Sequence, residues 1–74
     1  MNNKLLPIKE VAHMLGVQPQ TIRQWECKYA LIRATRTEQG HRVYPYYQIK
    51  RMYLIQNLLQ TGLTIEQIQT LIDD

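Results

Sequence analysis

The stretch that decides the fold is IKEVAHMLGVQPQTIRQWECKYALI, residues 8–32. Its first part has apolar residues at helical spacing, which predicts a helix that begins near Pro7 and buries one face. Gly16 is expected to end this helix, because glycine readily adopts the left-handed conformation of a C-cap. After a short turn, Pro19 occupies the first position of a second helix. Two short helices joined by a glycine-containing turn predict a helix-turn-helix over residues 7–30.

The second helix has one apolar and one polar face. Ile22 and Trp25 lie on the side that we expect to anchor it to the first helix, and Tyr29 is expected to pack beside them. On the same side, Glu26 is expected to form an ion pair with an arginine of the following segment. The polar face carries Gln20, Thr21, Arg23, Gln24 and Lys28.

Residues 33–44 have no helical period and predict a hairpin. Gly40 suits a turn position with positive φ, while Val43 and Tyr44 favour a strand. We predict a two-stranded hairpin, here called the wing, which must pack against the helices because it is too small to be stable alone. The basic side chains of the wing are Arg36, His41 and Arg42.

Residues 45–72 predict a pair of helices. Pro45 is expected to begin the third helix, and Thr61 and Gly62 to end it. Thr64 and Gln67 have the spacing of a capping box at the start of the fourth helix. The apolar face of that helix is predicted to be Ile65, Ile68, Leu71 and Ile72. The expected fold is therefore mainly α, a winged helix-turn-helix of four helices and a two-stranded wing, forming one domain over residues 1–74.

Charge is unevenly distributed along the chain. Residues 1–60 hold all nine Lys and Arg against three Glu, whereas residues 61–74 hold only Glu66, Asp73 and Asp74. A basic body indicates an anionic partner, although a solvated surface would explain the charge equally well. No apolar run is long enough to cross a bilayer and no secretory signal is evident, so a cytoplasmic location is expected.

The polar face of the second helix fits a DNA-binding interpretation. An α-helix fits the DNA major groove, where Arg23 can bind guanine and Gln20 or Gln24 can bind adenine with paired hydrogen bonds. Thr21 can contact a base or a thymine methyl, and Lys28 is better placed for a phosphate. The wing's basic side chains can hold the flanking backbone or minor groove, which sets affinity rather than sequence choice.

The same residues argue against an enzyme or a metal protein. His13, His41 and Cys27 are scattered, whereas a structural zinc site needs four closely spaced ligands. No nucleophile–base pair stands out, and the single cysteine excludes an intrachain disulfide. We therefore expect no catalytic residues, no cofactor and no metal.

Three segments taken together resemble the DNA-binding domain of MerR-family transcription regulators. They are IKEVAHMLGVQPQTIRQWECKYALI as the helix-turn-helix, RTEQGHRVY as the wing and IKRMYLIQNLLQTGLTIEQIQTLI as the helix pair. The resemblance runs from about Leu6 to Ile72. Trp25, in place of a tyrosine, is similar to the branch with cobalamin-linked light regulators and curli regulators. Ala30 departs from the family, which usually has glycine there.

The resemblance implies a winged helix-turn-helix that binds promoter DNA as a homodimer on an inverted repeat. It implies DNA contacts by Thr21, Arg23 and Gln24, and by Arg42 and Tyr44 in the wing. Arg36 matches the leading arginine of the family's wing, and Lys28 matches a basic position that touches the DNA backbone. The family's long dimerisation helix and sensor domain are not in this sequence, so this chain alone is expected to be monomeric.

Two other functions fit the same sequence. One is an architectural DNA binder of the excisionase type, which an adjacent integrase gene would favour. The other is a protein-interaction module that docks an acidic antirepressor. NMR shift changes confined to the third and fourth helices on adding DNA would favour it.

Overall fold

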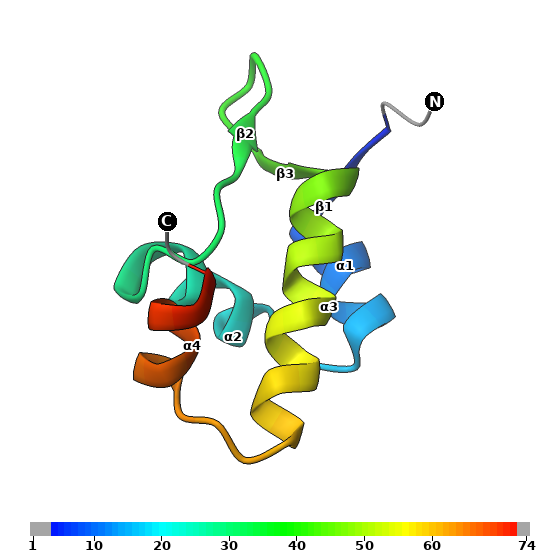
Figure 1. Cartoon of the computed structure of the whole chain (residues 1–74). Helices are drawn as coiled ribbons and strands as arrows, with labels where there is room; N and C mark the ends of the chain where they lie inside the picture. The colour runs from blue at the N-terminus through cyan, green and yellow to red at the C-terminus, as the bar shows by residue number, and fades with distance from the viewer. Residues whose placement is uncertain (1–3, 73–74) are drawn as a thin grey trace.

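The computed structural model describes residues 4–72 of the chain, so Asp73 and Asp74 of the expected acidic end lie outside the described residues (Figure 1). The helical segments are α1 (Ile8–Leu15), α2 (Pro19–Arg23) continued by the π-helical turn η1 (Gln24–Lys28), α3 (Tyr46–Gln60) and α4 (Ile65–Ile72). The strands are β1 (Leu5–Pro7), β2 (Thr35–Arg36) and β3 (Arg42–Pro45). The expected class, four helices with a small wing, is confirmed.

The sheet has three antiparallel strands, one more than predicted. β3 is central and lies between β1 and β2. Arg36 pairs with Arg42 in the wing, and Leu6 pairs with Tyr44 on the other side of β3. The prediction of a two-stranded sheet was therefore incomplete, because β1 exists only through its pairing with a strand distant in the sequence.

Two glycines form the turns that the sequence predicted. Gly16 has φ 72° and ends α1, with its N–H donating to the carbonyl groups of Ala12 and His13. Gly40 has φ 84° in the turn of the wing, where its N–H donates to the Thr37 carbonyl over 2.9 Å. Both positions need the left-handed conformation that glycine adopts without steric cost.

The second helix changes geometry after Arg23. Its last turn is π-helical, and the Tyr29 N–H donates to the Gln24 carbonyl five residues back, over 3.1 Å. The segment then ends at Ala30, which is left-handed with φ 53°. The sequence predicted a continuous α-helix here, so the π turn is a correction. Ala30 adopts the left-handed conformation that the glycine usual in the family would adopt without strain. Turns of this kind occur often at functional sites.

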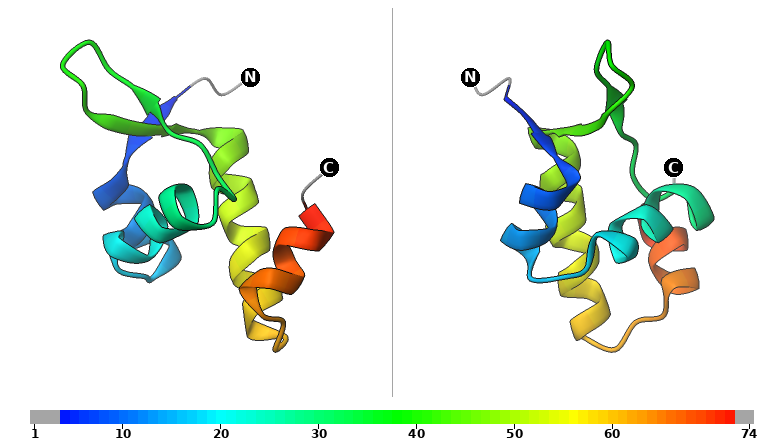
Figure 2. Two further views of the ribbon diagram at one scale, coloured as in Figure 1. Left: turned by 90° about the vertical axis from the view of Figure 1, so that its left-hand side faces the viewer. Right: turned by 180° about the vertical axis from the view of Figure 1, so that it is seen from behind.

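The buried residues come from every helix and from the sheet. The largest fully buried side chains are Tyr44, Ile22, Met52, Ile55, Ile68 and Val11. Trp25 is only 3% exposed, so it anchors the second helix as predicted. In the left view of Figure 2 the hairpin extends at the top over the side that holds α1 and α2, with α3 and α4 on the other side.

The helix pair agrees with the sequence except at one residue. The Thr64 hydroxyl accepts a hydrogen bond from the Gln67 N–H, and the Gln67 side chain accepts one from the Thr64 N–H. This reciprocal pair is the predicted capping box. Leu71 was expected on the apolar face of α4 but is 61% exposed. Ile68, with the partly buried Ile65 and Ile72, makes up the packed face, and Leu71 lies off the edge of that stripe.

Candidate nucleic-acid interface

The exposed face of the second helix carries the predicted polar residues. Ile22 and Trp25 hold the opposite face in the core, and this fixes which side chains point outward. Thr21 is half-buried, whereas four side chains are exposed: Gln20, Arg23, Gln24 and Lys28. Within residues 4–72, the Arg23 guanidinium has no hydrogen bond or ion pair. It is therefore free to bind a ligand.

The wing is ordered by its own hydrogen bonds. The Thr37 N–H donates to the His41 carbonyl over 2.9 Å, and the His41 N–H donates to the Thr37 hydroxyl over 3.1 Å. The Arg36 Nη1 donates to the Gly40 carbonyl over 3.0 Å, which holds that exposed guanidinium along the hairpin. The basic side chains of the wing are thus presented by a closed turn.

One open depression joins the wing to the helix-turn-helix. Three arginines meet there: Arg23 from α2, and Arg36 and Arg42 from the wing. Its remaining lining is Pro7, Ile8, Lys9, Gly40 and His41. We call this surface the basic depression. Because its charged side chains come from β2, β3, α1 and α2, only the folded chain brings them together.

Glu26 connects the second helix to the sheet. Its Oε1 accepts a hydrogen bond of 2.7 Å from the Tyr44 hydroxyl and lies 3.0 Å from the Arg42 Nε. The predicted ion pair with a wing arginine is therefore confirmed. Arg42 also directs its Nη2 toward the Cys27 Sγ at 3.7 Å. Two residues of β3 thus bind the same turn of η1, and this fixes the wing relative to the helix.

The same contacts change the ionisation of two groups. Burial and the hydrogen bond to Glu26 raise the pKa of the Tyr44 phenol well above its ordinary value. The hydrogen bond to Glu26 likewise raises the pKa of the Arg42 guanidinium. The Tyr44 hydroxyl and the Arg42 guanidinium therefore stay protonated to a higher pH than usual and remain donors toward Glu26.

Two of the predicted contact residues are placed differently from the expectation. Tyr44 is fully buried, with its hydroxyl bound to Glu26, so the structure corrects its assignment as a DNA contact to that of a core residue. Arg42 lines the basic depression but shares its charge with Glu26. Only the position of Tyr44 was missed, because the sequence does not reveal that β3 lies directly against η1.

The other predicted residues lie outside the basic depression. Gln20, Thr21 and Gln24 are on the second helix but do not line it. The Lys28 ammonium lies 5.4 Å from the centre of the Tyr29 ring, at the far end of η1. These residues therefore extend the polar surface along the helix.

The sequence did not single out Lys9 as a contact residue. It lies in the first turn of α1 and lines the basic depression. In the sequence Lys9 is marked only by its position two residues after Pro7. That position does not reveal that the wing lines the same depression.

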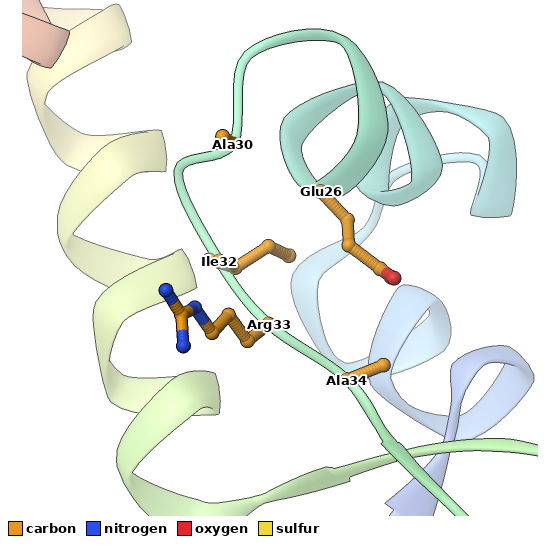
Figure 3. A pocket seen from close by; sticks show the side chains of 5 residues that line it. All are labelled: Glu26, Ala30, Ile32, Arg33 and Ala34. Atoms are coloured by element: carbon orange, nitrogen blue, oxygen red, sulfur yellow. The ribbon is translucent and has the colours of Figure 1, made fainter.

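A second hollow is separate from the basic depression and lies between η1 and the segment that leads to β2. Figure 3 shows its lining residues, which are Glu26, Ala30, Ile32, Arg33 and Ala34; the Arg33 side chain points toward α3. The Arg33 N–H donates to the Gln48 side chain over 3.0 Å. Arg33 does not line the basic depression.

Other kinds of site are not evident in the described part of the chain. Among residues 4–72 there is no group of three or more His, Cys, Asp or Glu placed to hold a metal ion. In the same range, no helix combines the length and apolar character needed to span a membrane.

Comparison with known proteins identifies the family. Residues 6–74 match the MerR HTH family regulatory proteins. The chain is 31% identical to the transcriptional regulator MlrA of Salmonella typhimurium, covering 92% of this chain and 28% of MlrA. It is 35% identical to ZntR of Escherichia coli, covering 88% of this chain and 46% of ZntR. The chain thus spans less than half the length of these relatives.

A solved structure has the same fold. It is the crystal structure of HiNmlR, a MerR family regulator lacking the sensor domain, bound to promoter DNA. The TM-score is 0.82 at 21% identity, and the match covers 95% of this chain and 56% of the other. The family match over residues 6–74 decides the assignment: this chain belongs to the MerR HTH family of regulatory proteins.

Proposed function

We propose that the chain is a sequence-specific DNA-binding domain of a transcription regulator, with the second helix in the major groove and the wing on the flanking backbone. The observation that carries the proposal is the basic depression, where Arg23 of α2 lies with Arg36 and Arg42 of the wing. A cationic surface formed by two separate elements can neutralise backbone phosphates on either side of a DNA groove.

Sequence choice is assigned to the second helix. Arg23 is exposed and unpaired within the described residues, so it can form two parallel hydrogen bonds with O6 and N7 of a guanine. Gln20 and Gln24 are exposed on the same helix and can form the equivalent pair with adenine. Thr21 is half-buried, which suits a close contact with a base edge or methyl group.

Affinity and register are assigned to the wing and to Lys28. Arg36 and His41 are exposed on the hairpin and can reach backbone phosphates, which carry no sequence information. Arg42 contributes mainly by fixing the wing through Glu26. Lys28 lies further along the helix, where a backbone contact is the natural role.

The proposed target is an inverted repeat in promoter DNA. The relatives named above are transcriptional regulators, and the related solved chain is bound to promoter DNA. A single copy of this chain would occupy one half-site as a monomer. Two linked copies would bind much more tightly, because the second contact then occurs at a high effective concentration.

The experiment begins by selecting duplexes from a random-sequence pool with the wild-type chain. Affinities of the wild type and Arg23→Ala are then measured for a selected duplex and for one of mixed sequence. Arg23→Ala is expected to weaken binding to the selected duplex about 5- to 150-fold, corresponding to ~1–3 kcal/mol for a bidentate base contact. It should weaken binding to the mixed duplex much less.

Lys50→Ala is the matched control. Lys50 is exposed on α3, with its ammonium 5.6 Å from the centre of the Tyr46 ring, and it does not line the basic depression. Its removal should leave both affinities unchanged. Equal affinities of Arg23→Ala and the wild type would reject the role of Arg23, and failure to select any preferred sequence would reject sequence-specific recognition.

A further inference from the structure

We propose that Lys9 is a further DNA-contact residue, which binds a backbone phosphate at the edge of the basic depression that α1 forms. This inference rests on the proposed function, because it adds a third element, α1, to the surface formed by the second helix and the wing. It also assigns a role to a residue that the sequence did not single out.

The geometry places Lys9 opposite the wing. It lines the basic depression together with its neighbours Pro7 and Ile8, while Gly40 and His41 of the hairpin line the same surface. Arg23 of α2 also lines it. A phosphate group lying at the α1 edge of the basic depression would therefore meet cations from α1 and the hairpin, while Arg23 is left for a base.

No acidic side chain competes for Lys9. In the part of the chain that the structure describes, its ammonium has no ion pair, hydrogen bond or ring contact. The neighbouring Glu10 does not line the basic depression; it lines a separate hollow with His13 and Met14, which Lys9 also borders. The lysine is therefore exposed and available on the side facing the wing.

The start of α1 favours an anion at the same place. Pro7 is the N-cap and makes no side-chain hydrogen bond to the helix. The first N–H groups of α1 are therefore not capped by a side chain. The N-terminus of a helix also carries a partial positive charge. These backbone groups and the Lys9 ammonium would act on the same phosphate.

Charge within the basic depression supports a third cation. Arg42 shares its charge with Glu26, which leaves Arg23 and Arg36 as the two arginines there without an acidic partner among the described residues. Lysine is a flexible point charge, which suits a phosphate contact better than the fixed geometry of base recognition. Lys9 is thus assigned to the backbone and not to sequence choice.

The test measures binding of a fluorescent mixed-sequence duplex by the wild type and four variants between 0.1 and 0.2 M salt. The variants are Lys9→Ala, Lys9→Arg, Arg36→Ala and Lys50→Ala. The logarithm of the binding constant falls with the logarithm of the salt concentration, and one lost phosphate contact reduces the magnitude of this slope by about 0.9. Lys9→Ala should therefore bind about 8-fold more weakly at 0.1 M and about 4-fold more weakly at 0.2 M. Lys9→Arg should bind like the wild type, and so should Lys50→Ala.

The outcomes separate this inference from the proposed function. If the wild type binds with a steep salt dependence, Arg36→Ala weakens it and Lys9→Ala does not, the role of Lys9 is overturned while the DNA-binding function stands. If the wild type does not bind the duplex at all, the proposed function itself fails. If Lys9→Ala and Lys50→Ala weaken binding equally, only net charge matters, and a specific contact by Lys9 is overturned.

Discussion

The hydroxyl of Tyr44 donates a hydrogen bond of 2.7 Å to the carboxylate of Glu26, so the central strand of the sheet is bound to the π turn of the second helix. Tyr44 is fully buried, and Glu26 retains only 15% of its side-chain exposure. A hydrogen bond to a charged acceptor in such a place is stronger than one between neutral groups. This contact therefore helps to hold the central strand against the second helix, together with the ion pair between Arg42 and Glu26.

Tyr44→Phe is expected to lower the free energy of unfolding by about 1.5–3 kcal/mol. The ring still fills its place in the core, but the buried carboxylate loses a donor. Urea denaturation measures the change. The exposed Tyr47, which has no hydrogen bond within residues 4–72, supplies the control, and Tyr47→Phe should have no effect. A Tyr44→Phe protein as stable as the wild type would show that the contact is not needed.

The raised pKa of Tyr44 predicts a loss of stability at high pH. The unfolded chain ionises this phenol near its ordinary pKa of about 10, whereas the folded chain keeps it protonated to a higher pH. At a pH between the pKa of the unfolded chain and the higher pKa of the folded chain, the folded state binds one proton more. Stability therefore falls as pH rises above about 10. The slope approaches ~1.4 kcal/mol per pH unit for one proton.

Unfolding measured between pH 9 and pH 11 tests this alkaline effect. The difference between the wild type and Tyr44→Phe isolates the contribution of this phenol from those of the other tyrosines. The stabilities of the two proteins should converge as the pH rises. Parallel curves across this range would contradict the proposed ionisation.

Salt dependence should report the number of phosphate contacts. Four or five cations on phosphates predict a slope of log K against log salt of about −4. Arg36→Ala should reduce the magnitude of this slope by about 1 and weaken binding equally for selected and mixed duplexes, because a phosphate contact does not read sequence. Fluorescence anisotropy at several salt concentrations measures both effects. A loss confined to the selected duplex would instead assign Arg36 to a base.

Ala30 is expected to carry backbone strain. Its φ of 53° lies in the left-handed region, where a residue with a Cβ is disfavoured by roughly 1–2 kcal/mol. Ala30→Gly removes this strain but gives the unfolded chain more freedom, so the net gain in stability should be about 0.5–1 kcal/mol. Gly16→Ala should act in the opposite direction, since Gly16 has φ 72° and open space for a Cβ. Destabilisation by Ala30→Gly would refute the strain.

The capping box should be a measurable source of stability. Thr64→Ala removes the hydroxyl that accepts the Gln67 N–H over 3.1 Å, and is expected to cost about 1 kcal/mol. Thr70→Ala in the same helix is the control, because its exposed hydroxyl bonds only to the Glu66 carbonyl. That change should stay within about 0.5 kcal/mol. Equal effects of the two substitutions would argue against the cap.

Features encoded over a few residues were predictable from the sequence. Gly16 and Gly40 were expected at positive φ, and Thr64 with Gln67 was expected to form a capping box. The apolar spacing placed Ile22 and Trp25 in the core, because helical periodicity fixes the buried face whatever the face packs against. These local rules were enough to predict the class of fold and the exposed face of the second helix.

Features that depend on distant neighbours could not be predicted in the same way. β1 is three residues long and contains proline, so it is too short to show a strand pattern in the sequence, and it forms through pairing with β3. Tyr44 was assigned to DNA because the sequence does not show that Glu26 lies beside it. The π turn has no sequence signature that we recognise. Lys9 gains its proposed role only from the surface opposite it.

The junction at Pro45 has a mechanical consequence. β3 ends at this residue and α3 begins at the next, so no loop separates the central strand from the longest helix. The proline ring restricts φ, which is −73° here, and also limits the backbone of the residue before it. Strand and helix are therefore joined without a flexible loop, and a rotation of α3 at its N-terminal end is expected to move β3 and the hairpin with it.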